Sequence, residues 1–124
     1  MIRIDEDMVL LLHQLIVQET GGAPDLRDKT LLDSALQGAF QTSGGKDLYH
    51  TKEEKAARLG HSLISHHAFV DGNKRIGMLA MLTFLEANGI PLRCAPGDIA
   101  AAGLAVASGE MSCKDLLDWI LARR

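Results

Sequence analysis

Aromatic residues are scarce in this chain: only 4% of its 124 residues are Phe, Trp or Tyr. The core must therefore be built from Leu, Ile, Ala and Met, a composition that favours helices. The chain has only 2 cysteines, Cys94 and Cys113, which lack CxxC spacing and are too few for a disulfide framework. We expect both to remain thiols in a reducing compartment.

A basic excess and long apolar runs are also missing. Lys and Arg number 13 against 16 Asp and Glu, and the formal net charge of −3 argues against direct binding of nucleic acid. No apolar run reaches the length of a membrane span, and the first residues, MIRIDEDMVL, are acidic where a signal peptide is basic. These absences predict a cytoplasmic protein without a membrane anchor, with a single domain over residues 1–124.

Apolar residues recur at helical spacing in several segments, and no segment shows the alternation of a strand. Asp5 and Asp28 are suited to cap the first two helices, and Thr51 with Glu54 forms a capping box before the third. The predicted helices cover about 5–19, 28–39, 51–66, 73–88, 97–108 and 113–122. The predicted inner face of the first helix is Met8, Leu11, Leu12, Leu15 and Ile16. We predict an all-α fold, a compact bundle of about six helices, with a loop or short flap over 41–50.

One polar segment between the third and fourth predicted helices has the sequence HAFVDGNKR, residues 67–75. Gly72 and Asn73 lie where a helix begins, and the first amides of a helix form a ready site for an anion. Lys74 and Arg75 add two cations that suit phosphate, although cations oppose the helix dipole at this end. This half of the segment predicts a phosphate-binding site.

The first half of the segment adds groups for catalysis. Asp71 supplies a hard oxygen ligand that suits Mg²⁺ shared with substrate phosphates, although as a single residue it would serve equally well as a helix cap. His67 can accept a proton near neutral pH, although a histidine taken alone is more often structural. Phe69 is expected to anchor the loop on the core. The joint pattern is far rarer than any of its parts, and it predicts phosphoryl transfer.

These residues resemble the signature of the Fic family, HxFx(D/E)GN(G/K)R, and the lysine at position 74 is similar to the death-on-curing (Doc) toxin branch. The resemblance extends to residues 21–36 and 47–57, so it covers nearly the whole chain. It implies a compact helical bundle with His67 as general base and Asp71 as the Mg²⁺ ligand. By the same resemblance, the phosphates of ATP are bound by Gly72, Asn73, Lys74 and Arg75. A flap that aligns the target protein by strand-like pairing is implied for Ser43, Gly44, Gly45, Lys46, Asp47, Leu48 and Tyr49.

Two departures from the common Fic pattern bear on the reaction. Fic enzymes that transfer AMP usually carry glycine where this chain has Lys74, and a further arginine where it has Met78. The resemblance therefore implies a Doc-type toxin that transfers the γ-phosphate of ATP to a Thr or Ser hydroxyl, with elongation factor Tu as the expected target and a block of translation as the result. Transfer of AMP or another nucleotide to a protein hydroxyl is the alternative.

Two further interpretations remain open. One is a helical module that binds a partner without catalysis, which the intact motif disfavours. The other is a metal site of His61, His66 and His67, which helical spacing disfavours. The inhibitory pattern (S/T)xxxE(G/N) does not occur, so we expect a separate antitoxin similar to Phd, with a segment that folds as a helix in an apolar groove. His13, His50, His61 and His66 receive no role from the sequence.

Overall fold

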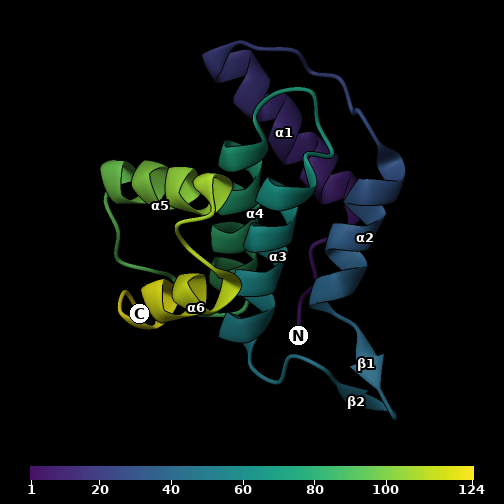
Figure 1. Cartoon of the computed structure of the whole chain (residues 1–124), viewed down its shortest axis with the longest axis vertical. Helices are drawn as coiled ribbons and strands as arrows, with labels where there is room; N and C mark the ends of the chain where they lie inside the picture. The colour runs from purple at the N-terminus through teal and green to yellow at the C-terminus, as the bar shows by residue number, and fades with distance from the viewer.

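The computed structural model describes residues 1–124 except for the side chain of Ser43, so this position of the predicted flap lies partly outside the description. Over the described residues the chain forms six helices and one small hairpin, which confirms the predicted all-α fold (Figure 1). None of these helices is both long and apolar enough to cross a membrane. The elements are α1 (Glu6–Thr20), α2 (Lys29–Ala39), β1 (Thr42–Ser43), β2 (Lys46–Asp47), α3 (Lys52–His66), α4 (Asn73–Ala87), α5 (Pro96–Ser108) and α6 (Cys113–Leu121).

The helices begin at the capping residues that the sequence offers. Asp5 accepts a hydrogen bond from the Met8 amide at 2.9 Å, and the Thr51 hydroxyl accepts one from the Glu54 amide at 3.0 Å. Each bond satisfies an amide that has no partner within its own helix. Because capping is a local interaction, the predicted helix starts agree with the structure to within a residue or two.

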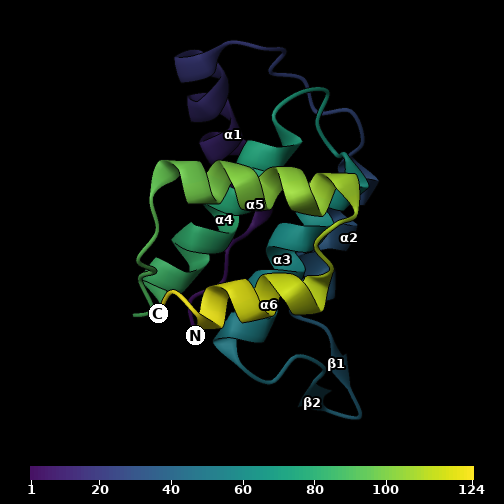
Figure 2. The same cartoon turned by 60° about the vertical axis from the view of Figure 1, so that its left-hand side comes forward.

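The two central helices, α3 and α4, pack side by side along the middle of the molecule. Helices α1 and α2 cover one side of this pair and α5 and α6 the other (Figures 1 and 2). The connection between α3 and α4 lies at one end of the pair. The β1–β2 hairpin lies at the opposite end in both views, which places the two predicted functional segments far apart.

Glycines allow the close approach of α3 and α4. A Cβ atom added at Gly77 of α4 would lie 2.4 Å from Cγ1 of Ile64 and 2.9 Å from the carbonyl oxygen of Gly60, both on α3. Real Cβ atoms do not approach other heavy atoms so closely, and the backbone oxygen cannot rotate away as a side chain can. The central helix pair therefore depends on the absence of a side chain at this position.

We expect Gly77→Ala to lower the free energy of unfolding by about 1–3 kcal/mol, because the added methyl group overpacks the α3–α4 contact. Gly97→Ala in α5 is the matched control, since nothing lies within 4 Å of a Cβ added there. That variant should be neutral or up to about 1 kcal/mol more stable, because alanine favours the helix. Denaturant titrations followed by circular dichroism measure both values, and an equal effect at the two positions would contradict the close packing.

The predicted inner face of α1 is partly wrong. Met8, Leu11 and Leu15 are 40%, 52% and 50% exposed, and the buried residues of this helix are Val9, His13 and Ile16. Both sets repeat at helical spacing, so periodicity alone cannot choose between them. The contact of α1 with α4 decides which face is buried, and that contact is not local in the sequence.

Candidate active site

The connection between α3 and α4, residues 67–72, is here called the motif loop. Its first residue, His67, has a left-handed backbone with φ 52° and ψ 49°, and its last, Gly72, is left-handed with φ 80°. Glycine adopts this conformation at no steric cost, whereas His67 is the one described residue other than glycine with a positive φ. Such backbone strain costs about 1–3 kcal/mol and persists where the surrounding structure enforces it.

The segment between α1 and α2 forms several hydrogen bonds with the motif loop. The amides of Arg27 and Asp28 donate to the carbonyl oxygen of Ala68 at 2.7 and 3.0 Å, and the Val70 amide donates to the carbonyl of Asp25 at 3.1 Å. The Arg27 side chain also donates from Nε to the carbonyl oxygen of His67 at 2.7 Å. A guanidinium at the end of α3 satisfies carbonyls that have no helical partner, and here it fixes the strained backbone of His67.

The side chains of Phe69 and Asn73 fix the motif loop, Phe69 by packing in the core and Asn73 by hydrogen bonds to the loop backbone. Phe69 is 2% exposed, and its ring stacks on the ring of His13 from α1 with centroids 3.7 Å apart. Asn73 accepts a hydrogen bond from the Phe69 amide at 3.1 Å and donates one to the Phe69 carbonyl at 2.9 Å. Phe69 therefore anchors the loop, while the Asn73 side chain is engaged with the loop backbone; binding of phosphate by Asn73 stays a prediction.

His13 is a site residue that the sequence did not indicate. It is 1% exposed, and its Nε2 lies 2.7 Å from the carbonyl oxygen of Asp71, a contact that requires the proton on Nε2. A Cβ added at Gly72 would lie 3.4 Å from the same nitrogen, so the ring is packed beneath the Asp71–Gly72 peptide. The one available signal was a histidine in helical register with the apolar residues Val9 and Ile16.

A pocket of about 390 Å³, here called the anion pocket, opens at the start of α4. Asp71, Gly72, Asn73, Lys74 and Arg75 of the motif line one side of it, and the other side is lined by Thr20, Gly21 and Gly22. The first turn of α4 contains no acidic residue, so its amides and the two cations create a positive end. The structure brings together five predicted site residues in this anion pocket, whereas His67 lies exposed at the other end of the motif loop.

Asp71 is suited to hold a divalent cation. Its carboxylate is exposed at the anion pocket, and Oδ2 accepts a hydrogen bond from the Ala23 amide at 2.9 Å, while Oδ1 accepts none from the described residues. Mg²⁺ is commonly bound by one or two carboxylates together with substrate phosphates and water. A single oriented carboxylate beside a phosphate pocket therefore fits this ion.

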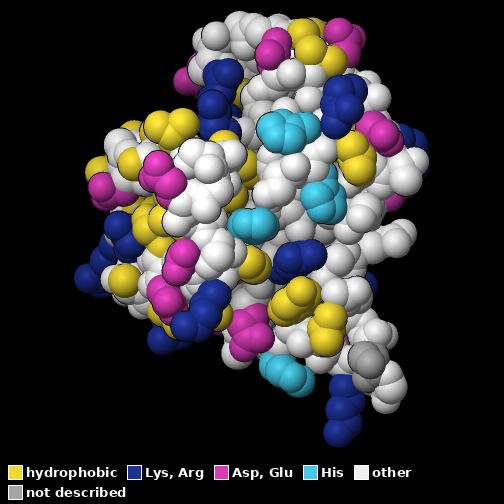
Figure 3. Space-filling view, viewed as in Figure 1, with side chains coloured by type: hydrophobic (Ala, Val, Ile, Leu, Met, Phe, Trp, Pro, Cys, Tyr) yellow, Lys and Arg dark blue, Asp and Glu magenta, His cyan; other side chains and the backbone are white. Residues whose placement is uncertain are grey.

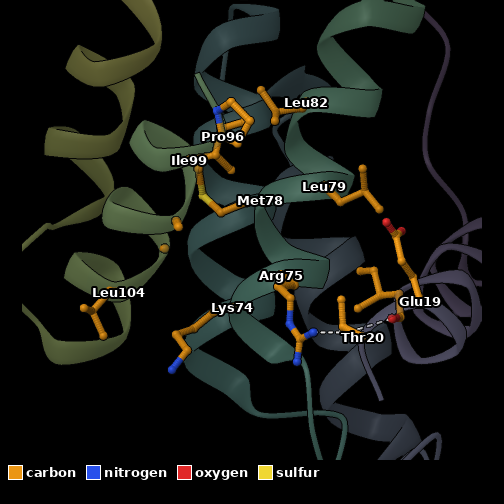
Figure 4. Close-up of a pocket in the computed structure, with 13 residues that line it drawn as sticks. Glu19, Thr20, Lys74, Arg75, Met78, Leu79, Leu82, Pro96, Ile99 and Leu104 are labelled. Atoms are coloured by element: carbon orange, nitrogen blue, oxygen red, sulfur yellow. Dashed lines mark hydrogen bonds between the residues drawn. The ribbon is translucent and has the colours of Figure 1, made fainter. Parts of the chain in front are cut away.

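An apolar groove of about 570 Å³ continues from the anion pocket between α1, α4 and α5 (Figure 4). Thr20, Lys74 and Arg75 line both hollows, and the Arg75 guanidinium donates to the Thr20 hydroxyl. The floor and walls of the groove are mainly Ile16, Met78, Leu79, Leu82, Ile99 and Leu104. An occupant of this groove would lie against the cations of the anion pocket.

The predicted flap lies far from the motif loop. Thr42 pairs with Asp47 in a short antiparallel hairpin. The hairpin comes before α3 in the chain, and His67 comes directly after α3. A helix of 15 residues spans about 22 Å, so His67 and the hairpin are at opposite ends of α3. Lys55 of α3, 3% exposed, fixes the hairpin there through Asp47 at 3.1 Å and the carbonyl of Tyr49. Docking of a target by this hairpin stays a prediction, and the geometry offers no direct contact with His67.

The other histidines do not form a metal centre with His67. Histidine side chains lie at the surface over α3 (Figure 3), but no three His, Cys, Asp or Glu of the described residues gather as a metal site would require. Nδ1 of His66 lies 3.3 Å from the carbonyl of Leu31. The pKa of His61 is lowered, first by burial and then by the nearby charges of Arg58 and His66.

These features define a helical fold with a strained loop and a positively charged pocket at the start of a central helix. The profile of the Fic/DOC family matches residues 3–85, which is more than half of the chain, and the protein belongs to this family. The chain is 46% identical over 72 residues to Toxin Doc of Mycolicibacterium smegmatis (strain ATCC 700084 / mc(2)155). The matched part is 58% of this chain and 55% of Toxin Doc, so it spans about half the length of that relative.

Proposed function

We propose that this protein transfers the γ-phosphate of ATP to a Thr or Ser hydroxyl of another protein. The anion pocket carries the proposal: it combines the first amides of α4 with Lys74, Arg75 and the carboxylate of Asp71. Such a set of groups suits a triphosphate and its metal ion. His67, at the other end of the same loop, supplies the base that a hydroxyl acceptor requires.

The surroundings of Met78 favour transfer of phosphate over transfer of AMP. Met78 is 2% exposed, and a Cβ added at Gly103 of α5 would lie 3.3 Å from its Cγ. Helix α5 therefore covers the position where AMP-transferring Fic enzymes usually present a second arginine. Lys74 further occupies the position of their second glycine. Both differences change how the phosphates of a nucleotide can lie at this helix start.

The proposed reaction assigns the acceptor hydroxyl to His67 and the phosphates of ATP to the anion pocket. His67 removes the proton from the acceptor hydroxyl, whose oxygen then attacks the γ-phosphorus. The bond from the γ-phosphorus to the oxygen that bridges it to the β-phosphorus breaks, and ADP leaves. Lys74, Arg75 and the α4 amides stabilise the charge on the phosphates throughout. Mg²⁺ held by Asp71 would supply further neutralisation of this charge.

The proposed biological role is that of a toxin, because the similar protein from Mycolicibacterium smegmatis carries the name Toxin Doc. We propose elongation factor Tu as the target, on the resemblance to the Doc branch. Its phosphorylation would stop translation in the cytoplasm, where this factor acts.

An antitoxin similar to Phd is proposed for the apolar groove between α1, α4 and α5. The groove offers the apolar floor that an amphipathic helix requires, and charged residues, Glu19, Lys74 and Arg75, lie at its rim. A helix bound there would cover the two cations of the anion pocket. Occlusion of the nucleotide site would explain inhibition without any change of fold.

The experiment that tests the proposed function compares two labels. The protein is incubated with Mg²⁺ and elongation factor Tu, together with ATP labelled at the γ-phosphorus or, separately, at the α-phosphorus. We expect the target to take up label from the γ position alone. Label from the α position alone would show transfer of AMP and contradict the proposal, and absence of both labels would contradict transfer to this target.

A further inference from the structure

A second polar groove lies between α2 and α3 and shares no lining residue with the anion pocket. This groove, here called the α2–α3 groove, has a volume of about 630 Å³. It is lined by Thr30, Asp33, Ser34, Gln37, Gly38 and Gln41 on the side of α2, and by Arg58 and His66 of α3. Thr30, Ser34, Gln37 and Gln41 give the groove uncharged polar side chains on the side of α2.

The length and course of the groove suit an extended peptide. From Thr30 to Gln41 the helix and its last turn rise about 16 Å, which equals about five residues of extended chain. Gln41 directly precedes β1 of the hairpin, and His66 directly precedes the proposed base His67. The groove therefore connects the hairpin with the motif loop, the two segments that α3 holds apart.

Arg58 gives the groove an unbalanced positive charge. Its Nε is buried and has no hydrogen-bond partner in the described part of the chain, and no described carboxylate lies within ion-pair distance of its guanidinium. Asp33, the acidic residue of the groove, is paired instead with Lys29 at 3.1 Å. The guanidinium lies over the ring of Tyr49, 6.0 Å from its centroid, and next to the Cys113 thiol, so none of its neighbours among the described residues carries a negative charge that balances it. The unpaired Nε carries a desolvation cost, and an incoming carboxylate would supply the missing counter-charge.

Gly38 of α2 lies close to the guanidinium and leaves room beside it. A Cβ added at this glycine would lie 4.0 Å from Nε of Arg58, so any longer side chain would fill the space above the cation. The neighbouring side chains of Ser34, Gln37 and Gln41 are exposed and carry both donors and acceptors. Such side chains suit the amides and carbonyls of an extended backbone.

We propose that the α2–α3 groove binds an extended segment of the protein to be modified, with an acidic side chain of that segment opposite Arg58. The segment enters beside the hairpin and brings its hydroxyl residue to His67. This inference rests on the proposed function, because it assigns a docking surface to the acceptor of the same transfer reaction.

The test measures steady-state transfer of the γ-label to elongation factor Tu. Gln37→Trp fills the groove from an exposed position, and Gln14→Trp, at an exposed position of α1 outside the described pockets, is the matched control. We expect Gln37→Trp to raise KM for elongation factor Tu by about tenfold or more with kcat and KM for ATP unchanged, because it removes binding that is equal in the ground and transition states. Gln14→Trp should match the wild type.

A second pair of variants addresses the charge. Arg58→Gln should raise KM for elongation factor Tu, and Arg58→Lys should restore part of the loss, because lysine keeps the charge and lacks the fork. If Gln37→Trp and Gln14→Trp have the same KM while the wild type transfers label, the groove proposal is overturned and the proposed function stands. If the wild type itself transfers no label, the proposed function fails and the groove proposal fails with it.

Discussion

His67→Asn is expected to lower the rate of phosphate transfer by about 10²–10⁴-fold, the usual loss when a positioned general base is removed. The fold should persist, because His67 is exposed and its ring makes no hydrogen bond to a described residue. Asparagine is preferable to alanine here, since the backbone at this position is left-handed and asparagine tolerates that conformation better. The measurements are single-turnover transfer of the γ-label and thermal melting.

His50→Asn is the matched control for this variant. His50 is exposed and lines none of the described pockets, so the same substitution there should leave both the transfer rate and the melting temperature unchanged. Transfer at the wild-type rate by His67→Asn would remove His67 from the reaction. A large drop in its melting temperature would instead show that the residue serves the fold.

Local interactions are the part of the structure that the sequence predicted well. The starts of α1 and α3 are set by the side chains of Asp5 and Thr51, which bond to amides three residues away. The grouping of Asp71, Lys74 and Arg75 is also local, because they lie within five consecutive residues around one helix start. Because the residues of such features are close together in the sequence, the sequence alone predicts how they lie relative to one another.

Contacts between distant segments were not predictable in the same way. His13 reaches the motif loop only because α1 packs against α4, and that packing buries Val9 and His13 in place of Leu11 and Leu15, while Ile16 is buried as predicted. Because α1 has apolar residues on two of its faces, only its packing against the other helices determines which face is buried. The hydrogen bond from the Arg27 side chain to the His67 carbonyl likewise joins residues that are 40 positions apart in the sequence.

The placement of the hairpin changes how substrate docking must be viewed. The resemblance implied that a flap over residues 43–49 aligns the target protein, and α3 separates this flap from the motif loop by its full length. A peptide that contacts the hairpin must therefore extend along the molecule to reach His67. The α2–α3 groove provides such a path between Gln41 and His66.

Phe69→Ala is expected to lower the free energy of unfolding by about 3–5 kcal/mol, the range for a fully buried phenylalanine. Phe69 is 2% exposed and stacks on His13, and its backbone is bonded to the Asn73 side chain and bridged to Leu26. Since domains are stable by only about 5–15 kcal/mol, the loss would be a large share of the total. Denaturant titration measures it, with Phe69→Leu expected to lose less.

Phe84→Ala is the control that separates two roles of Phe69, its anchoring of the motif loop and its contribution to the stability of the core. Phe84 of α4 is fully buried and packs against Phe40, away from the anion pocket, so its truncation should cost a similar free energy of unfolding. At a temperature where both variants remain folded, only Phe69→Ala should bind ATP with Mg²⁺ more weakly, because the loop that orients Asp71 and Gly72 has lost its anchor. Equal ATP affinity in the two variants would mean that Phe69 stabilises the core without positioning the site, and that His13 and Asn73 hold the motif loop by themselves.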